Sequence, residues 1–127
     1  MEGAELATVI AGAETGRRLR RGLVIVGGDA GAACGAEMVA GTIVIGGGTG
    51  TLAGAAMRRG SIFALGGALR VGATFADCGV HDLIFLRLLA RHLTALGLGS
   101  LAARLGPLRR WMGDAAVGGT GELLVPA

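Results

Sequence analysis

GLVIV at residues 22–26 is followed by GTIVI at residues 41–45 and by GSIFA at residues 60–64, so that nineteen residues separate each stretch from the next. The same interval recurs elsewhere: it joins Gly28 to Gly47 and Gly66, Gly31 to Gly50, Gly35 to Gly54, and Met38 to Met57. A fixed period of this length is typical of stacked structural repeats. We therefore expect an all-β solenoid with coils of about nineteen residues.

The repeat also predicts which side chains form the core. Side chains alternate along a strand, so every second residue of each stretch should point inward. The predicted inward columns are Val24, Ile43 and Ile62; Val26, Ile45 and Ala64; Ala33, Leu52 and Val71; and Met38 with Met57. Glycine suits the corners between the strands because it accepts positive φ and has no side chain to collide with the next coil. Residues 3–21 fit the period in part and indicate an incomplete first coil.

The character of the chain changes near Asp82. Residues 82–97 predict a helix with Asp82 as N-cap and Gly97 as C-cap, and Ser100 is expected to cap a second short helix that extends to Leu105. The first helix is apolar on most faces, so we expect it to be buried between the coils and something else. A last strand is expected at residues 122–125. The domains predicted are β-helix coils at 1–78, as the C-terminal part of a longer stack, and a helical appendage with a terminal strand at 79–127.

Composition narrows the class of partner and the compartment. The net charge is +3, all 12 basic residues are arginine, and only four residues are aromatic. Nucleic-acid binding is not expected, because the first two arginine clusters, at 17–21 and 58–59, contain no aromatic residue for stacking. The uncharged run 38–57 has the length of a membrane span, but it contains six glycines, and the repeat explains it better. Cys34 and Cys78 form no paired motif, which favours reduced thiols and a cytoplasmic protein.

One motif imitates a nucleotide site. Gly48, Gly50 and Ala53 match the G-x-G-x-x-A variant of the dinucleotide-binding loop. The next strand is expected to start near Ser61, which leaves too little chain for the helix that this motif requires. The same glycine pattern occurs nineteen residues earlier, near Gly28. We therefore interpret the glycines as part of the repeat and keep an NAD(P)-binding enzyme only as an alternative of a different class.

The other reactive side chains do not form a recognisable site in the sequence. Residues of the right types for a metal site or a Cys–His nucleophile lie at Asp77, Cys78, His81, Asp82 and His92, but the spacing of a four-ligand set is missing. Cys34, Met38 and Met57 are interpreted as core residues. Asp29 and Glu37 lie eight residues apart and do not indicate a carboxylate pair. We assign no catalytic, cofactor-binding or metal-binding residue to this chain.

The repeated unit resembles a known family. GAEMVAGTI at residues 35–43 and GAAMRRGSI at residues 54–62 are similar to the glycine-repeat β-helix family that contains the C subunit of formylmethanofuran dehydrogenase and the C-terminal domain of the glutamate synthase large subunit. This resemblance covers roughly residues 12–75. The helix sequence LLARHL at 88–93, LRRWMGD at 108–114 and GTGELL at 119–124 look like the C subunit as found in bacterial formyltransferase/hydrolase complexes.

The resemblance implies a right-handed parallel β-helix and a non-catalytic, structural C subunit in one-carbon metabolism, from formaldehyde to formate. Its implied partners are formyltransferase, amidohydrolase-like and dehydrogenase-like subunits. The complex would use a methanofuran-type carrier, with a molybdenum or tungsten pterin in archaeal relatives, and this chain would hold no cofactor. Family members usually have more coils before the matching region, so a fragment of a longer subunit is expected. A glutamate synthase-like domain is the alternative within the family.

Overall fold

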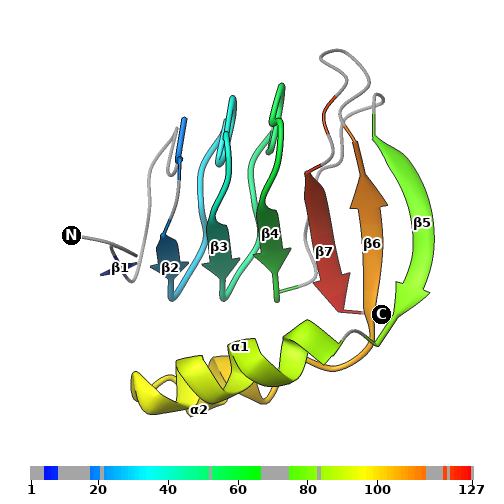
Figure 1. Cartoon of the computed structure of the whole chain (residues 1–127). Coiled ribbons are helices and arrows are strands. Elements are labelled where there is room, and N and C mark those ends of the chain that lie inside the picture. The colour runs from blue at the N-terminus through cyan, green and yellow to red at the C-terminus, as the bar shows by residue number, and fades with distance from the viewer. Residues whose placement is uncertain are drawn as a thin grey trace.

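The computed structural model describes residues 5–8, 18–20, 22–51, 53–66, 75–82, 84–113, 119 and 121–126. Within these residues the chain forms seven strands and two helices (Figure 1). In chain order they are β1 (Glu5–Thr8), β2 (Leu23–Val26), β3 (Thr42–Ile45), β4 (Ser61–Ala64), β5 (Ala76–His81), α1 (Ile84–Ala95), α2 (Gly99–Ala102), β6 (Leu108–Met112) and β7 (Glu122–Pro126).

All seven strands belong to one mixed sheet, in the order β1-β2-β3-β4-β7-β6-β5. The first five strands of this order are parallel, and β6 and β5 continue the sheet in antiparallel pairing. The register from β2 to β3 and from β3 to β4 is nineteen residues, since Leu23 pairs with Thr42 and Thr42 with Ser61. The step from β1 to β2 is eighteen, because Glu5 pairs with Leu23. The incomplete fit of residues 3–21 to the period thus corresponds to this shorter step between β1 and β2.

The predicted fold class, an all-β solenoid with a right-handed parallel β-helix of about 19-residue coils, is wrong. The strands lie in one open sheet of mixed direction with two helices against it, which makes the chain a small α/β domain. The nineteen-residue interval sets the register of only three parallel strands, and the sheet then continues through β7, β6 and β5, which lie outside the period. The division into residues 1–78 and 79–127 stays a prediction, and β7 of the second part pairs with β4 of the first.

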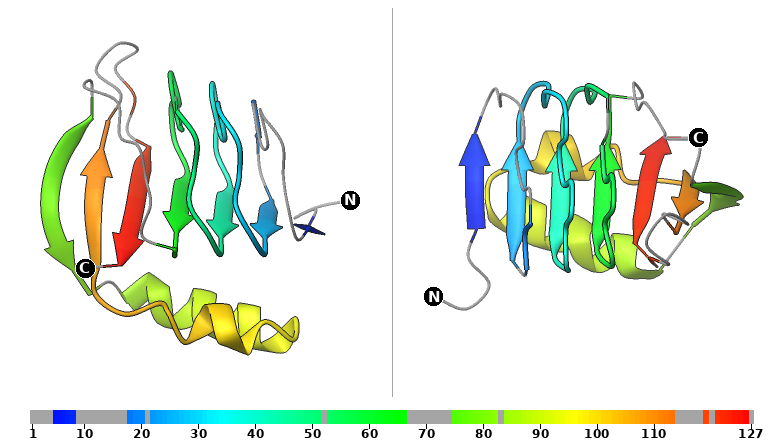
Figure 2. Two further views of the ribbon diagram at one scale, coloured as in Figure 1. Left: turned by 180° about the vertical axis from the view of Figure 1, so that it is seen from behind. Right: turned by 90° about the horizontal axis from the view of Figure 1, so that it is seen from above.

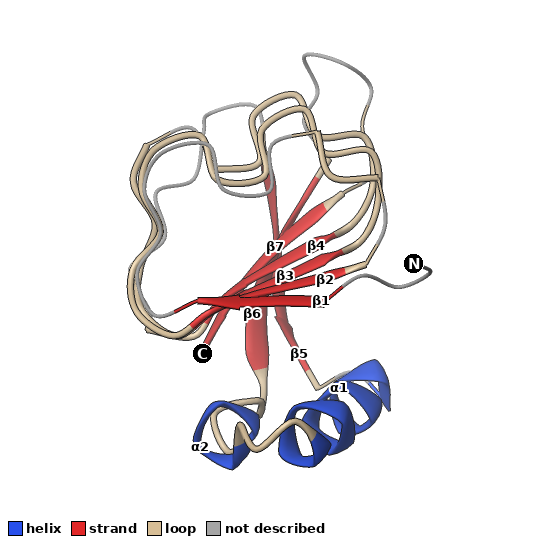
Figure 3. Cartoon of the chain, turned by 90° about the vertical axis from the view of Figure 1, so that its left-hand side faces the viewer, coloured by secondary structure: helices blue, strands red, loops and turns tan. Residues whose placement is uncertain are grey.

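Both faces of β2, β3, β4 and β7 are buried, in two separate clusters. On the face towards the helices lie Leu23, Ile25, Val44, Phe63 and Leu124. The opposite face, which the loops between the strands enclose, carries Val24, Val26, Ile43, Ile45, Ile62 and Leu123, together with Cys34, Met38 and Met57 (Figure 3). The predicted inward columns of the strands are confirmed, because their members are buried and all except Ala64 belong to the second cluster. In the predicted third column Ala33 is only half-buried and belongs to neither cluster, and Leu52 and Val71 lie outside the described residues.

The helices cover one face of the sheet, as Figures 1 and 2 show. The buried side of α1 consists of Leu86, Leu89 and Leu93, which join the cluster that contains Val44 and Phe63. The predicted helix at 82–97 is confirmed in position, and Gly97 beyond its end has φ +80°. Ser100 does not cap the second helix: α2 begins at Gly99, and its N-cap residue, Leu98, makes no side-chain capping hydrogen bond.

Candidate functional site

The loop after β3 does not form a dinucleotide site, because its backbone groups bond to the preceding repeat. The N–H of Gly47 donates to the carbonyl of Gly28 at 2.8 Å, and the N–H of Gly48 donates to Oδ1 of Asp29 at 2.8 Å. Turns, with no helix, follow β3 in the described part of residues 46–60. The donors that would hold a pyrophosphate at a helix N-terminus are therefore missing from this loop. The glycines instead allow two repeats to approach closely.

The acidic and histidine residues near β5 make separate contacts and do not form a catalytic pair. Nε2 of His81 lies 2.7 Å from the backbone carbonyl of Cys78, while the Cys78 thiol donates to the carbonyl of Ala76 at 3.6 Å. Asp77 accepts a hydrogen bond from the N–H of Gly79 and forms an ion pair of 2.8 Å with Arg109. These contacts stabilise the edge strand locally. Over the residues with a described placement, no group of three or more His, Cys, Asp or Glu side chains could hold a metal ion.

The two cysteines differ in environment, and neither is in a disulfide. Cys34 is fully buried in the cluster with Met38 and Met57, as the sequence predicts. Burial raises the pKa of the Cys34 thiol from 9.0 to about 11, because desolvation disfavours the thiolate. This cysteine is consequently a neutral, unreactive thiol at physiological pH. Cys78 is exposed on β5.

The outer side of α1 is the first of two surfaces whose side chains are suited to binding a partner. Ile84 is 79% exposed and Leu88, one turn later, is 61% exposed. Arg87 and Arg91 are exposed on the same helix, and none of its twelve residues is acidic. Residues four apart lie on one helix face, so the two large apolar side chains form a continuous strip next to positive charge. The sequence predicts a helix buried on both sides; the sheet covers one side, and this strip is open.

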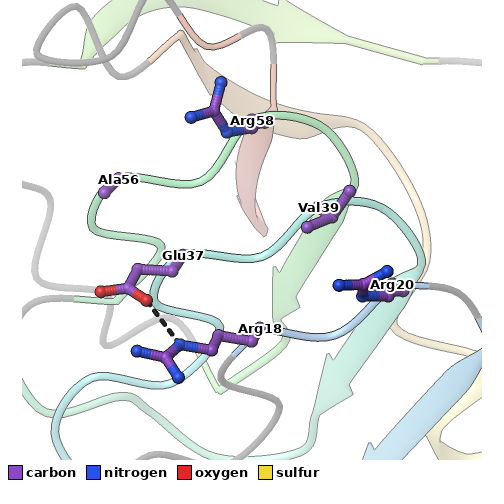
Figure 4. Close-up of a pocket in the computed structure, with 6 residues that line it drawn as sticks. All are labelled: Arg18, Arg20, Glu37, Val39, Ala56 and Arg58. Carbon is purple, nitrogen blue, oxygen red and sulfur yellow. Dashed lines mark hydrogen bonds and ion pairs between the residues drawn. The ribbon is translucent and has the colours of Figure 1, made fainter.

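The second surface is a pocket in the loops before β2, β3 and β4, with a volume of about 370 Å³ (Figure 4). Its lining is Arg18, Arg20, Glu37, Val39, Ala56 and Arg58. These residues come from three successive repeats at equivalent positions, 18, 37 and 56 in one column and 20, 39 and 58 in the next. Nε of Arg18 forms an ion pair of 2.7 Å with Glu37. The pocket, hereafter the arginine pocket, thus combines three guanidinium groups with one carboxylate.

Neither surface is predicted from the sequence, although a signal for each is present. In the sequence Arg20 and Arg58 belong to two separate arginine clusters, yet they lie two repeats of nineteen apart. Residues in equivalent positions of successive repeats lie side by side, so this spacing brings the two side chains to one place. For α1, Ile84 and Leu88 fall on the side of the helix opposite Leu86, Leu89 and Leu93 once the 3.6-residue period is applied.

The fold and these surfaces define a small α/β domain that offers an apolar helix strip and a basic pocket to its surroundings. In the described part of the chain, neither helix has the length and apolar character needed to cross a membrane.

Known proteins that are similar to this chain point to one particular kind of protein. The C subunit of the formyltransferase/hydrolase complex Fhc from Methylorubrum extorquens (strain AM1) is 50% identical over 54 residues, which are 42% of this chain and 20% of that protein.

A solved structure extends this similarity over nearly the whole chain. A chain in the crystal structure of the formyltransferase/hydrolase complex (FhcABCD) from Methylorubrum extorquens, in complex with methylofuran, matches 98% of this chain at 45% identity and a TM-score of 0.88. The predicted resemblance to the C subunit of a formyltransferase/hydrolase complex is therefore confirmed. The match covers 47% of that chain, so this sequence spans about half the length of the solved relative. No family model matches the sequence.

Proposed function

We propose that this chain is a structural, non-catalytic subunit of a formyltransferase/hydrolase complex that acts in the one-carbon conversion of formaldehyde to formate in the cytoplasm. The observation that carries the proposal is the match to a chain of the FhcABCD complex, with 45% identity over 98% of this sequence. That match favours this function over the glutamate synthase-like alternative. The NAD(P) alternative lacks the loop geometry that a dinucleotide requires, as described above.

The strip on α1 supports a role in assembly. Its exposed Ile84 and Leu88 would bury apolar area against a neighbouring subunit, and each large aliphatic side chain contributes roughly 1.5–3 kcal/mol when it is fully buried. Arg87 and Arg91 next to them favour a partner surface that carries carboxylates. We propose formyltransferase, amidohydrolase-like and dehydrogenase-like subunits as the partners. One of them would cover the strip.

The carrier is assigned to the complex as a whole. The solved relative is a complex with methylofuran, which supports a methanofuran-type carrier in the assembly. The proposal places no catalytic residue in this chain, since its buried thiol is protonated at neutral pH and its half-buried His81 forms a hydrogen bond with a backbone carbonyl. The contribution of the chain is then geometric: a rigid sheet and helix layer on which other subunits are positioned.

The test is affinity purification of the tagged protein from its native host, with the bound proteins identified by mass spectrometry. We expect recovery of formyltransferase and amidohydrolase-like subunits. Leu88→Glu should abolish their recovery, whereas Val80→Glu, at a 49% exposed apolar residue of β5, should leave it unchanged. Circular dichroism verifies that both variants fold. Recovery of the wild-type chain alone as a monomer would refute the subunit proposal, and retention of partners by Leu88→Glu would refute the docking strip alone.

A further inference from the structure

The arginine pocket brings positive charge together from repeats that are distant in sequence. Arg18, Arg20 and Arg58 face it with a single carboxylate, that of Glu37, so the lining carries a formal excess of two positive charges. Glu37 is bonded to Arg18 at 2.7 Å. Arg20 has no ion-pair partner among the residues whose placement is described. Like charges that converge on one hollow repel each other, and an anion between them removes that cost.

The spacing of the two arginines in one column suits a ligand between them. Neighbouring strands lie about 4.8 Å apart, so Arg20 and Arg58, two repeats apart, have backbones separated by roughly 10 Å. Val39 occupies the equivalent position of the repeat between them, and its short apolar side chain lies between the guanidinium groups (Figure 4). A guanidinium presents a planar fork of donors that matches carboxylate and phosphate oxygens. Two such forks on either side of a small residue form a clamp for an oxyanion.

The backbone of the rim is fixed in an uncommon conformation. Arg18, Glu37 and Ala56 have φ of 59°, 57° and 58°, although none of them is glycine. Non-glycine residues rarely occupy this left-handed region, and such residues concentrate where the surroundings fix the chain for binding. Hydrogen bonds between repeats hold them in place, for example from the N–H of Arg18 to the carbonyl of Ala36 at 2.9 Å. The backbone that carries the pocket is therefore held in place by contacts between repeats.

We propose that the arginine pocket is a binding site for a small, multiply charged oxyanion, a polycarboxylate or a phosphate compound, held between Arg20 and Arg58. The volume of about 370 Å³ lies within the range of small-molecule sites. The ion pair with Arg18 keeps Glu37 at the rim, where its carboxylate discriminates against negative charge at that end. The inference is independent of the proposed role in a complex, because the lining residues all belong to this chain.

Isothermal titration of the full chain at low ionic strength tests the site, with citrate and pyrophosphate as separate probes. We expect binding of at least one probe at a single site, and the preferred probe identifies carboxylate or phosphate chemistry. Arg20→Ala combined with Arg58→Ala should weaken binding at least about tenfold, the equivalent of one charge-assisted hydrogen bond. Arg87→Ala combined with Arg91→Ala removes the same charge from α1 and should change the affinity less than about twofold, since exposed distant charges are screened.

Glu37→Gln gives a result that a purely structural role would not produce. The amide keeps the size of the side chain and removes one negative charge from the lining, so binding should become several-fold tighter. Absence of binding by the wild-type chain to both probes would overturn the proposal. Equal loss in the two arginine double variants would also overturn it, since it would show attraction to net charge rather than a site.

Discussion

The hydroxyl of Ser61 donates a hydrogen bond of 2.6 Å to Oε1 of Glu122, across the junction where β7 joins β4. The other carboxylate oxygen of Glu122 accepts a hydrogen bond of 2.5 Å from Nε of Arg110 on β6. One side chain thus connects the last parallel strand that follows the nineteen-residue register to the strand at which the sheet reverses direction. Glu122 is only 15% exposed and Arg110 26%, so both charges are partly removed from water.

Replacement of Glu122 should destabilise the fold through this junction. Glu122→Ala leaves the Arg110 guanidinium and the Ser61 hydroxyl without their partner, and we expect a loss of about 1–3 kcal/mol in the free energy of unfolding. Glu122→Gln keeps an acceptor for Ser61 but loses the charge, and should fall between wild type and Glu122→Ala. Urea denaturation followed by circular dichroism measures all three.

The matched comparison is the ion pair between Asp77 and Arg109, whose side chains are 40% and 43% exposed. Water screens this pair, so Asp77→Ala should cost less than about 1 kcal/mol. If Asp77→Ala lowers the free energy of unfolding as much as Glu122→Ala does, burial does not distinguish the two ion pairs.

At Gly46 the backbones of two successive repeats approach each other closely. A Cβ atom at this position would collide with the carbonyl oxygen of Gly27, a backbone atom that cannot rotate away. The N–H of Gly46 also donates to Val26 at 2.7 Å, and its carbonyl accepts from Arg104 at 2.6 Å. Gly46→Ala should therefore cost about 1–3 kcal/mol or more, as for overpacking in a core.

Gly99 is the control for Gly46, because an added Cβ there meets nothing within 4 Å and the residue lies in α2. Gly99→Ala should raise the stability by up to about 1 kcal/mol through helix propensity. Thermal unfolding of both variants provides the measurement. Similar midpoints for Gly46→Ala and wild type would contradict the close contact of the two repeats.

Ile43 lies in the middle of the core, fully buried between Val24 and Ile62 of the adjacent strands. Ile43→Asp puts an unpaired charge there, and we expect a loss of more than about 4 kcal/mol, enough to unfold a marginally stable domain. Ile84→Asp introduces the same residue at an exposed position and should change the stability by about 1 kcal/mol or less. Sedimentation and circular dichroism of the two proteins test the contrast. A folded Ile43→Asp protein would disprove the assignment of this core column.

Cys34 predicts a dependence of stability on alkaline pH. Its pKa is raised to about 11 in the folded protein, so the unfolded chain loses the thiol proton first as the pH increases. The unfolded state then binds fewer protons than the folded state, and stability falls as the pH rises from 9 to 11, by about 2–3 kcal/mol for this shift. Below pH 9 the contribution of the protonated Cys34 thiol to the stability is fully present.

The chain lacks tyrosine and lysine, whose titration would otherwise obscure this pH range. Urea unfolding at several pH values should show the decline in wild type, and Cys34→Ala should reduce it. A thiol reagent at neutral pH should label one cysteine in the native protein, the exposed Cys78, and two after unfolding. Rapid labelling of both thiols in the folded state would contradict the burial of Cys34.

The sequence predicts the parts of the fold that have a local period. Alternation along the strands correctly indicates the buried position of Ile43 and Ile45, and the 3.6-residue period indicates α1. The continuation of the sheet could not be predicted in this way. Ser61 and Glu122 are 61 residues apart, and their pairing depends on how the intervening helices bring the chain back. No local pattern of residues encodes such a return.

The edge strand β5 could not be predicted for a related reason. Its sequence ADCGVH lacks apolar alternation, and four of its six residues are exposed. Its extended conformation is fixed by pairing with β6, and it contains an irregularity in register between Asp77 and Val80. The arginine pocket could be predicted from the sequence only in part. Its two-repeat spacing is visible in the sequence, but the open space above Val39 depends on side-chain positions that only the structure provides.

The equal steps from β2 to β3 and from β3 to β4 have a consequence for how such a gene can change. Loss of residues 42–60 would place Ser61 opposite Leu23 and keep every side chain on its own face, whereas loss of one residue would turn the following strand inside out. The pairing of the sheet by itself would therefore tolerate the loss or gain of whole nineteen-residue units. The helices restrict such changes, because their one apolar cluster reaches from Leu23 through Phe63 to Leu108. The helix layer therefore limits the loss or gain of units between β2 and β7.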